Sequence, residues 1–251
     1  MKEERNIGIW VAIVIIAAVI GFGVYYFGLR EDDVEETKPK VTYTEDELKF
    51  KEEYESINGQ EKSNGSVYKT IDIPKDNNVE YLTDEETVKF LENGTGIIYM
   101  GFKECPWCRN AVPVLLQAAK NAGMKKVYYL DVTDIKSTIV INAKGKAEIT
   151  KKGTDAYYEI MDLLDDYLVD YTMKNSKGKD VKTGEKRIMS PTVITVKEGV
   201  VTGFHVGTID GHEMVDGALP DLTEKEQGEL NDIYAEMINT VSDSACNDGC
   251  D

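Results

Sequence analysis

The chain has 251 residues and a formal net charge of −17, from 46 acidic and 29 basic side chains. A surface this acidic repels phosphate backbones, so we expect no nucleic-acid partner. The length is enough for one ordinary domain with extensions. The four cysteines form two close pairs, which is typical of a compartment where disulfides persist.

Residues 1–30 are expected to form a membrane anchor, because the run 7–29 contains no charged side chain. As a helix this run would be about 34 Å long, against about 30 Å of bilayer hydrocarbon. A cleaved signal peptide has a shorter apolar core, of about 7–15 residues, so we predict a permanent single span. Basic residues on both sides leave the orientation open, and the paired cysteines favour an extracytoplasmic C-terminal part.

The next segment, residues 31–78, is expected to be a charged stalk that carries a short helix and a lead-in strand. Thr44 and Glu47 match a capping box at the start of the helix, and Gly59 follows its end. The alternation of residues 66–73 predicts the strand.

The compact domain is expected over residues 79–241. It contains a strand buried on both faces, a densely apolar helix and a second buried strand, at residues 96–102, 106–122 and 126–132. A strand, helix and strand at this spacing form a βαβ unit, so the predicted fold class is α/β.

An insertion is expected at residues 133–186. Its apolar stripe between residues 157 and 171 predicts an amphipathic helix, and the polar residues 173–187 predict a loop. Beyond it, residues 190–207 predict a hairpin of two apolar strands, and a final helix covers about 223–241.

Cys105 and Cys108 lie three positions apart, where the first buried strand gives way to the helix. Cys105 is at the expected N-cap, where unpaired backbone N–H groups and the helix dipole stabilise a thiolate, and Pro106 fits the first helical position. Lys103 and Arg109 are expected to lower the pKa of Cys105 further. Cys108 is one turn further in and more buried. This pattern predicts that Cys105 attacks a disulfide and that Cys108 resolves the mixed disulfide.

Two other uses of the CPWC cysteines remain open. A zinc site needs four ligands, and the remaining candidates are Cys246, Cys250, His205 and His212. The histidines are seven positions apart, too far for a usual zinc knuckle, whereas the terminal cysteines could form one. A structural disulfide would gain nothing from a strand-to-helix turn. We therefore expect redox chemistry without a metal or another cofactor.

The order of these elements is that of the thioredoxin fold: buried strand, CPWC motif, helix with Pro113, second strand and final hairpin. The chain resembles the thioredoxin family over about residues 79–241, with a helical insertion before the strand of Pro191. The resemblance implies a cis bond before Pro191 and a Ser190 backbone that binds a substrate strand. Tyr99 departs from the pattern, because thioredoxins proper have a buried aspartate there that helps to move the proton of the second thiol.

The apolar N-terminus, residues 50–59 and the terminal CxxxC motif also resemble membrane-anchored thioredoxin-like proteins of Gram-positive bacteria, grouped as bacteriocin-transport accessory proteins. This resemblance implies an extracytoplasmic, membrane-tethered thiol–disulfide oxidoreductase that acts on protein thiols and disulfides. Such an enzyme could also exchange electrons with a redox partner in the membrane. The competing interpretation is a non-catalytic thioredoxin-fold binding module with a structural disulfide or a zinc site.

Three further residues carry expectations. Trp107 is expected to be exposed, where it either covers the disulfide or contacts apolar clients. Cys246 and Cys250 lie in the polar tail of residues 242–251, and the Asn, Asp and Gly between them can turn tightly enough for a disulfide. We expect a local clip separate from the active site; a second redox pair and a metal knuckle are the alternatives.

Overall fold

The computed structural model describes residues 15–20, 22, 25 and 42–242 of the chain. The chain divides into two units, Met1–Thr42 and Tyr43–Asp251, and the second contains the sheet and the helices that surround it. Most of the predicted span 7–29 lies outside the described residues, as do Cys246 and Cys250. Among the described residues, none of the helices combines the length and the apolar composition that crossing a bilayer requires.

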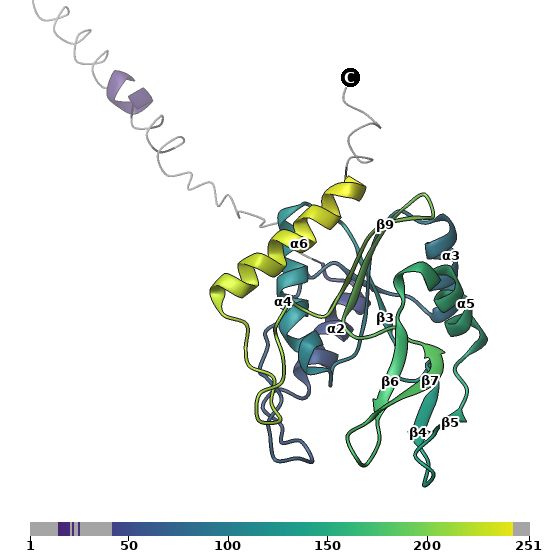
Figure 1. Ribbon diagram of the computed structural model, residues 1–251. Coiled ribbons are helices and arrows are strands. Elements are labelled where there is room, and N and C mark those ends of the chain that lie inside the picture. The colour runs from purple at the N-terminus through teal and green to yellow at the C-terminus, as the bar shows by residue number, and fades with distance from the viewer. Residues whose placement is uncertain (1–14, 21, 23–24, 26–41, 243–251) are drawn as a thin grey trace, which may run out of the picture. The chain divides into compact units, whose positions relative to one another are not determined.

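A mixed five-stranded sheet lies at the centre of the second unit, with the strand order β1-β3-β2-β8-β9 (Figure 1). Its strands are β1 (Val79–Tyr81), β2 (Gly96–Gly101), β3 (Val127–Asp131), β8 (Thr192–Lys197) and β9 (Val200–Val206). β3 pairs in parallel with both β1 and β2, whereas β8 pairs antiparallel with β2 and with β9. Every residue of β2 is buried, as expected of a strand covered on both faces.

Helices cover both faces of this sheet (Figure 1). They are α2 (Glu45–Glu55), α3 (Asp84–Asn93), α4 (Pro106–Asn121), α5 (Asp155–Leu163) and α6 (Glu224–Ser242). One core combines side chains of α2, α4 and α6 with Ile97 and Tyr99 of β2; the other combines α3 and α5 with Ile98 and Met100. Successive side chains of a strand point to opposite faces, so β2 contributes alternately to the two cores.

The central elements agree with the sequence-based expectations. The structure confirms the strands predicted at residues 96–102 and 126–132, which are β2 and β3. It also confirms the helices predicted at 106–122 and 223–241, which are α4 and α6, and the hairpin predicted at 190–207, which is β8 with β9. The βαβ unit is β2–α4–β3, and its two strands are parallel neighbours. The chain is therefore a mixed α/β protein in which the CPWC motif follows a central strand.

The predicted stalk is shorter than expected, because the compact unit begins at Tyr43 rather than at residue 79. Helix α2 belongs to the core: Phe50 and Tyr54 are both 0% exposed. These two aromatic rings, four positions apart, lie on one face of a helix whose other residues are charged except for the exposed Leu48. Such a narrow apolar face is easily mistaken for that of a solvated helix.

The prediction of a strand at residues 66–73 is wrong, since the segment has only an isolated bridge at Val67. Tyr68 bonds the main chain of Gly59 and Gln60, whereas the main chain further on bonds to side chains from α2 and the turn after it. The Asn58 amide bonds both main-chain groups of Ile71, and the Glu55 carboxylate accepts from the N–H of Ile73. Ile71 and Ile73 are buried, which explains the alternation that resembled a strand.

The insertion contains two β-hairpins beside a short helix, and not one long helix followed by a loop. The first hairpin is β4 (Thr138–Ile141) with β5 (Ala147–Lys151), and the second is β6 (Asp170–Lys174) with β7 (Asp180–Lys186). Figure 1 shows the two hairpins together at one edge of the domain.

The helical prediction for residues 157–171 is correct only for its first half. Helix α5 ends at Leu163, a 3-10 turn covers Asp165–Tyr167, and Tyr171 lies in β6. In β6 the residues alternate between exposed and half-buried, so Tyr171 continues the apolar spacing by a period of two rather than 3.6. The inward positions of β7 include Thr183 and Glu185, and such polar residues hide the strand from a hydrophobic pattern.

Candidate active site

Cys105 and Cys108 are held by the start of α4, directly after β2. Cys105 is the N-cap residue and Pro106 begins the helix. The Cys105 Sγ accepts a hydrogen bond from the backbone N–H of Cys108, with an N–S distance of 3.3 Å. Both residues are free thiols, and Cys105 is 4% exposed against 0% for Cys108. The predicted N-cap and the predicted order of burial are both confirmed.

The pKa values of the two thiols are shifted in opposite directions. A hydrogen bond from the Cys108 thiol is the largest cause that lowers the pKa of Cys105, and the backbone N–H groups of Cys108 and Trp107 and the charge of Lys136 act in the same direction. Burial opposes this shift. Burial is also the largest cause that raises the pKa of Cys108 well above its ordinary value, followed by its interactions with the Cys105 sulfur. Cys105 is therefore the more acidic thiol.

The electrostatic role predicted for Lys103 and Arg109 is not found, since neither is among the main causes of the Cys105 shift. The Arg109 side chain is 0% exposed. Its guanidinium donates hydrogen bonds to the side chain of Asn58. It also donates to the main-chain carbonyls of Lys69, Tyr54 and Lys103. Arg109 thus fixes the segments around α4, and Lys136 from the insertion supplies the charge near Cys105.

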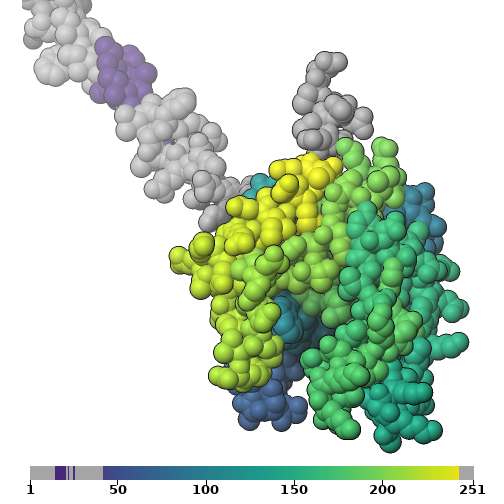
Figure 2. All heavy atoms as spheres, viewed as in Figure 1, coloured from purple at the N-terminus to yellow at the C-terminus, as the bar shows by residue number. Residues whose placement is uncertain are grey.

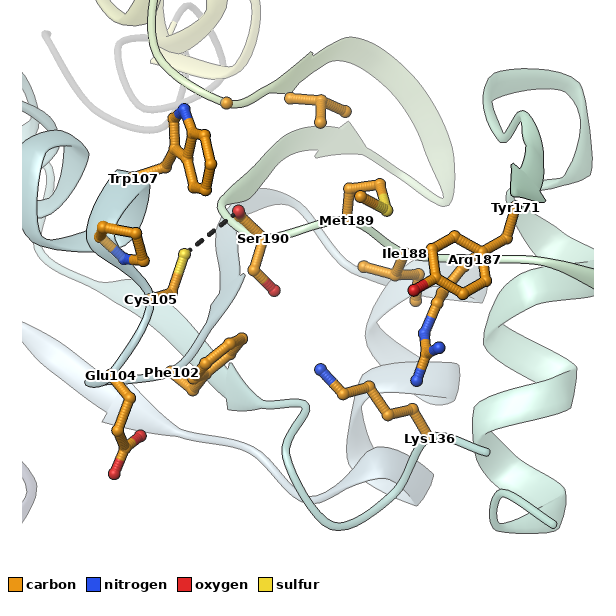
Figure 3. Close-up of a pocket in the computed structure, with 13 residues that line it drawn as sticks. Phe102, Glu104, Cys105, Trp107, Lys136, Tyr171, Arg187, Ile188, Met189 and Ser190 are labelled. Atoms are coloured by element: carbon orange, nitrogen blue, oxygen red, sulfur yellow. Dashed lines mark hydrogen bonds between the residues drawn. The ribbon is translucent and has the colours of Figure 1, made fainter. Parts of the chain in front are cut away.

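The main chain before Pro191 lies against the first cysteine. The Ser190–Pro191 bond is cis, which confirms the prediction from the sequence. The Cys105 thiol donates to the Ser190 carbonyl oxygen with an S–O distance of 3.3 Å (Figure 3). The Ser190 Oγ is buried and has no hydrogen-bond partner within the described part of the chain. An extended backbone at this position could pair with a substrate strand beside the thiol.

Trp107 is half-buried and packs against the core, so the prediction of an exposed indole is wrong. Its Nε1–H donates to the main-chain oxygen of His212 at 3.2 Å. The His212 ring in turn bonds the Thr208 hydroxyl and the Pro220 carbonyl, and His205 Nε2 bonds the Thr208 carbonyl. Both histidine rings therefore bond within residues 205–220, and the main chain of His212 links this segment to Trp107 at the start of α4.

No group of three or more His, Cys, Asp or Glu side chains is arranged to hold a metal ion among the residues that the structure describes. Cys246 and Cys250 lie outside those residues. Their predicted disulfide, and the alternatives of a redox pair or a metal knuckle, therefore remain predictions.

A pocket of about 530 Å³ opens beside Cys105. Figure 2 shows the surface hollowed between the yellow-green segment after β9 and the green hairpins of the insertion. The lining combines the start of α4, the main chain before the cis bond and three side chains from the insertion or its end: Cys105, Trp107, Met189, Ser190, Lys136, Tyr171 and Arg187. Sequence analysis missed the last three, because they are far from the CPWC motif along the chain.

A buried chain of tyrosine hydroxyls lies behind Cys108. The Tyr99 hydroxyl interacts with the Cys108 thiol and lowers its pKa, and the hydroxyl oxygens of Tyr99 and Tyr54 are 2.6 Å apart. Tyr54 also contacts Tyr129, with ring centroids 6.2 Å apart, and the Tyr129 hydroxyl donates to Glu53 at 3.2 Å. Because Glu53 is only half-buried, the chain connects Cys108 to the solvent side of α2.

Burial raises the pKa of Tyr99 and of Tyr54 well above the ordinary value, so both hydroxyls stay protonated. Neutral hydroxyls in such a chain can still pass a proton, by accepting one and donating another. Gly101 provides the space: a Cβ there would lie 2.1 Å from the Tyr99 hydroxyl oxygen. The tyrosine that replaces the expected aspartate is thus placed where it could serve the second thiol.

Comparison with family models, curated proteins and solved structures gives no match to this chain. The resemblance to thioredoxins therefore depends on the motifs and on the geometry described above.

Proposed function

We propose that the chain is a thiol–disulfide oxidoreductase with a thioredoxin-like domain, and that its substrates are cysteines of other proteins. One arrangement carries the proposal: an acidified thiol at the start of a helix, beside a second buried thiol and a cis-proline main chain. The Cys105 Sγ accepts from the N–H of Cys108 and donates to the carbonyl of Ser190, each at 3.3 Å. A merely structural disulfide has no need of an open pocket beside one sulfur.

The first step is attack of the Cys105 thiolate on one sulfur of a client disulfide. The client S–S bond breaks, a Cys105–client disulfide forms, and the departing client sulfur leaves as a thiolate that takes up a proton. The helix start stabilises the attacking thiolate through the N–H groups of Cys108 and Trp107. The main chain of Ser190 keeps the client strand beside the reacting sulfurs.

In the second step Cys108 loses its proton and attacks the Cys105 sulfur of the mixed disulfide. A Cys105–Cys108 disulfide forms, and the client sulfur is released as a second thiolate. The client disulfide has gained two electrons and the protein dithiol has lost two. The same steps run in reverse oxidise a client dithiol, and the relative stability of the two forms sets the direction.

We also propose that residues 7–29 tether the protein to the cell membrane, with the catalytic domain on the extracytoplasmic side. The support is the uncharged apolar run and the placement of the four cysteines in two close pairs along the sequence. Labelling of single-cysteine variants in intact cells with a membrane-impermeant maleimide tests this placement. Labelling only after lysis would contradict it.

Differential alkylation tests the proposed reaction. The reduced protein is treated with iodoacetamide at mildly acidic pH and mapped by mass spectrometry over time. We expect Cys105 to be modified well before Cys108, because its pKa is lowered and the pKa of Cys108 is raised. Equal rates, or protection of both thiols until a chelator is added, would instead favour the non-catalytic binding module with a zinc site.

A further inference from the structure

The pocket beside Cys105 has two cations on one wall, and most of its other lining residues are apolar. Lys136 precedes β4 and Arg187 follows β7, so both cations come from the insertion or its immediate end. Neither forms an ion pair with any residue that the structure describes. The chain has a net charge of −17, and the charge of Asp131 acts on Lys136 without forming an ion pair with it.

Both cations are fixed by contacts with aromatic rings. The Lys136 Nζ lies 4.6 Å from the centroid of the Phe102 ring, and the Arg187 guanidinium lies 4.7 Å from that of the Tyr171 ring. Arg187 also donates one N–H to the carbonyl of Ser137 at 2.7 Å. A guanidinium has five N–H donors, so most of its hydrogen-bonding capacity remains for a ligand.

Holding two like charges together in a partly buried site is unfavourable. Burial is the largest cause that lowers the pKa of Lys136, and the charge of Arg187 lowers it further. An incoming carboxylate would offset this repulsion and accept charge-assisted hydrogen bonds from both side chains. Lys136 already interacts with Cys105 and Asp131, and a carboxylate that enters the pocket would give both cations a direct partner.

The single acidic side chain in the lining is on the opposite side. Figure 3 shows Glu104 near the start of α4, directed away from Lys136 and Arg187. An acidic client side chain would be repelled on that side and attracted on the insertion side. The rate of reaction with an acidic client should thus depend on which side of the client cysteine the acidic residue lies.

The remaining lining suits a length of protein chain. The Ser190 Oγ offers an unused hydrogen-bonding group next to the main chain before Pro191. On the rim, Met189 and Val206 are 43% and 44% exposed. Apolar side chains that continue out of the pocket can contact residues of a client beyond its cysteine.

We propose that this pocket selects extended client segments that carry an aspartate or glutamate close to the reacting cysteine, with the carboxylate bound between Lys136 and Arg187. The inference rests on the proposed function, because it assigns a substrate class to the same site. It explains what the insertion adds to a dithiol that β2 and α4 already provide.

Peptides with one cysteine activated as a 2-pyridyl disulfide give a direct test, because attack by the protein releases pyridine-2-thione. One peptide frame is made with Asp, Asn or Lys at successive positions on either side of the cysteine. We expect the best Asp peptide to react about tenfold faster than its Asn counterpart at low salt, and the advantage to shrink as salt is added. The ratio between two peptides cancels any change in the intrinsic reactivity of Cys105.

Arg187→Gln should reduce the ratio of the reaction rates with the Asp and Asn peptides to about one or two. Arg187→Glu should react fastest with the Lys peptide. Lys186→Gln is the matched control, since the adjacent Lys186 pairs with Asp165 at 2.6 Å and does not line the pocket. Circular dichroism verifies the fold of each variant, and Lys136→Gln provides a second route if Arg187 variants do not fold.

If the wild-type protein reacted with the Asp, Asn and Lys peptides at the same rate, the inference would be overturned while the proposed function stayed intact. A glutathione 2-pyridyl disulfide that outpaces every peptide, and loses this lead in Arg187→Gln, would overturn the assignment to a protein segment. Failure of the proposed function looks different: no peptide would release thione faster with the wild-type protein than with Cys105→Ser.

Discussion

The two cysteines of the CPWC motif differ in their surroundings: one lies beside a pocket and the other in the core. Cys105 adjoins an open pocket that is lined by the cations Lys136 and Arg187. Cys108 is 0% exposed and faces the tyrosine cluster between α2 and the sheet. One helical turn thus separates the thiol beside the pocket, which we propose attacks substrates, from the buried thiol beside the tyrosines.

This contrast originates outside the βαβ unit that contains both cysteines. The insertion provides Lys136 on the Cys105 side, whereas α2 provides Tyr54 and Glu53 on the Cys108 side. The common motif supplies the dithiol, and the two peripheral segments make its sulfurs unequal. Changes to each segment should therefore affect different steps of the reaction.

Removal of either sulfur should have the largest effect and should separate the two roles. Cys105→Ser is expected to abolish thiol–disulfide exchange, because the nucleophile is lost. Cys108→Ser should retain the first attack and accumulate mixed disulfides with clients, since no second thiol resolves them. Non-reducing gel electrophoresis of the two variants with a model disulfide client measures this. Trapping by Cys105→Ser instead would reverse the assignment.

The Cys108 side should depend strongly on α2 for its stability. Phe50 is 0% exposed and its ring centroid lies 4.6 Å from that of Tyr54 and 5.0 Å from that of Tyr129. Phe50→Ala should lower the free energy of unfolding by about 3–5 kcal/mol, measured by urea denaturation. The control is Leu48→Ala on the same helix, where the side chain is 43% exposed. Equal small losses would show that α2 is only a stalk.

The hydroxyl chain behind Cys108 should speed the second step. Tyr99→Phe removes the hydroxyl that lowers the pKa of Cys108 and keeps the ring stacked 5.3 Å from Tyr129. Proton transfer by a positioned group is worth about 10²-fold or more, so resolution of the mixed disulfide should slow by at least about tenfold, seen by rapid quench. The attack by Cys105 should be little affected.

Tyr234→Phe is the matched control for this effect. Tyr234 is 0% exposed, and its hydroxyl has no hydrogen-bond partner among the described residues. The substitution therefore removes a buried hydroxyl without interrupting the chain from Cys108 to Glu53. Equal slowing in both variants would assign the effect to packing rather than to proton transfer.

The sequence was most informative where function is encoded locally. The N-cap position of Cys105 and the cis bond before Pro191 could both be predicted, because each depends on neighbouring residues and on an ordered set of motifs. Lys136, Arg187 and Tyr54 could not be predicted, since only tertiary structure brings them to the dithiol. The insertion was misread because the inward positions of its strands are partly polar.

The smallest predicted effect concerns the pH dependence of Cys105. Its pKa is lowered, so its thiolate persists at pH values where an ordinary thiol is already protonated, and its alkylation rate should fall only at lower pH. The charge of Lys136 is one cause of the lowering, after the hydrogen bonds from Cys108 and Trp107. Lys136→Met should therefore move the midpoint of the rate–pH profile upward, by less than about one pH unit.

Lys103→Met is the control for this prediction, since Lys103 is not among the main causes of the Cys105 shift. Its profile should coincide with that of the wild-type protein. A midpoint that moves equally in both lysine variants would mean that Cys105 senses the overall charge of the protein and not the cation that the insertion places beside it.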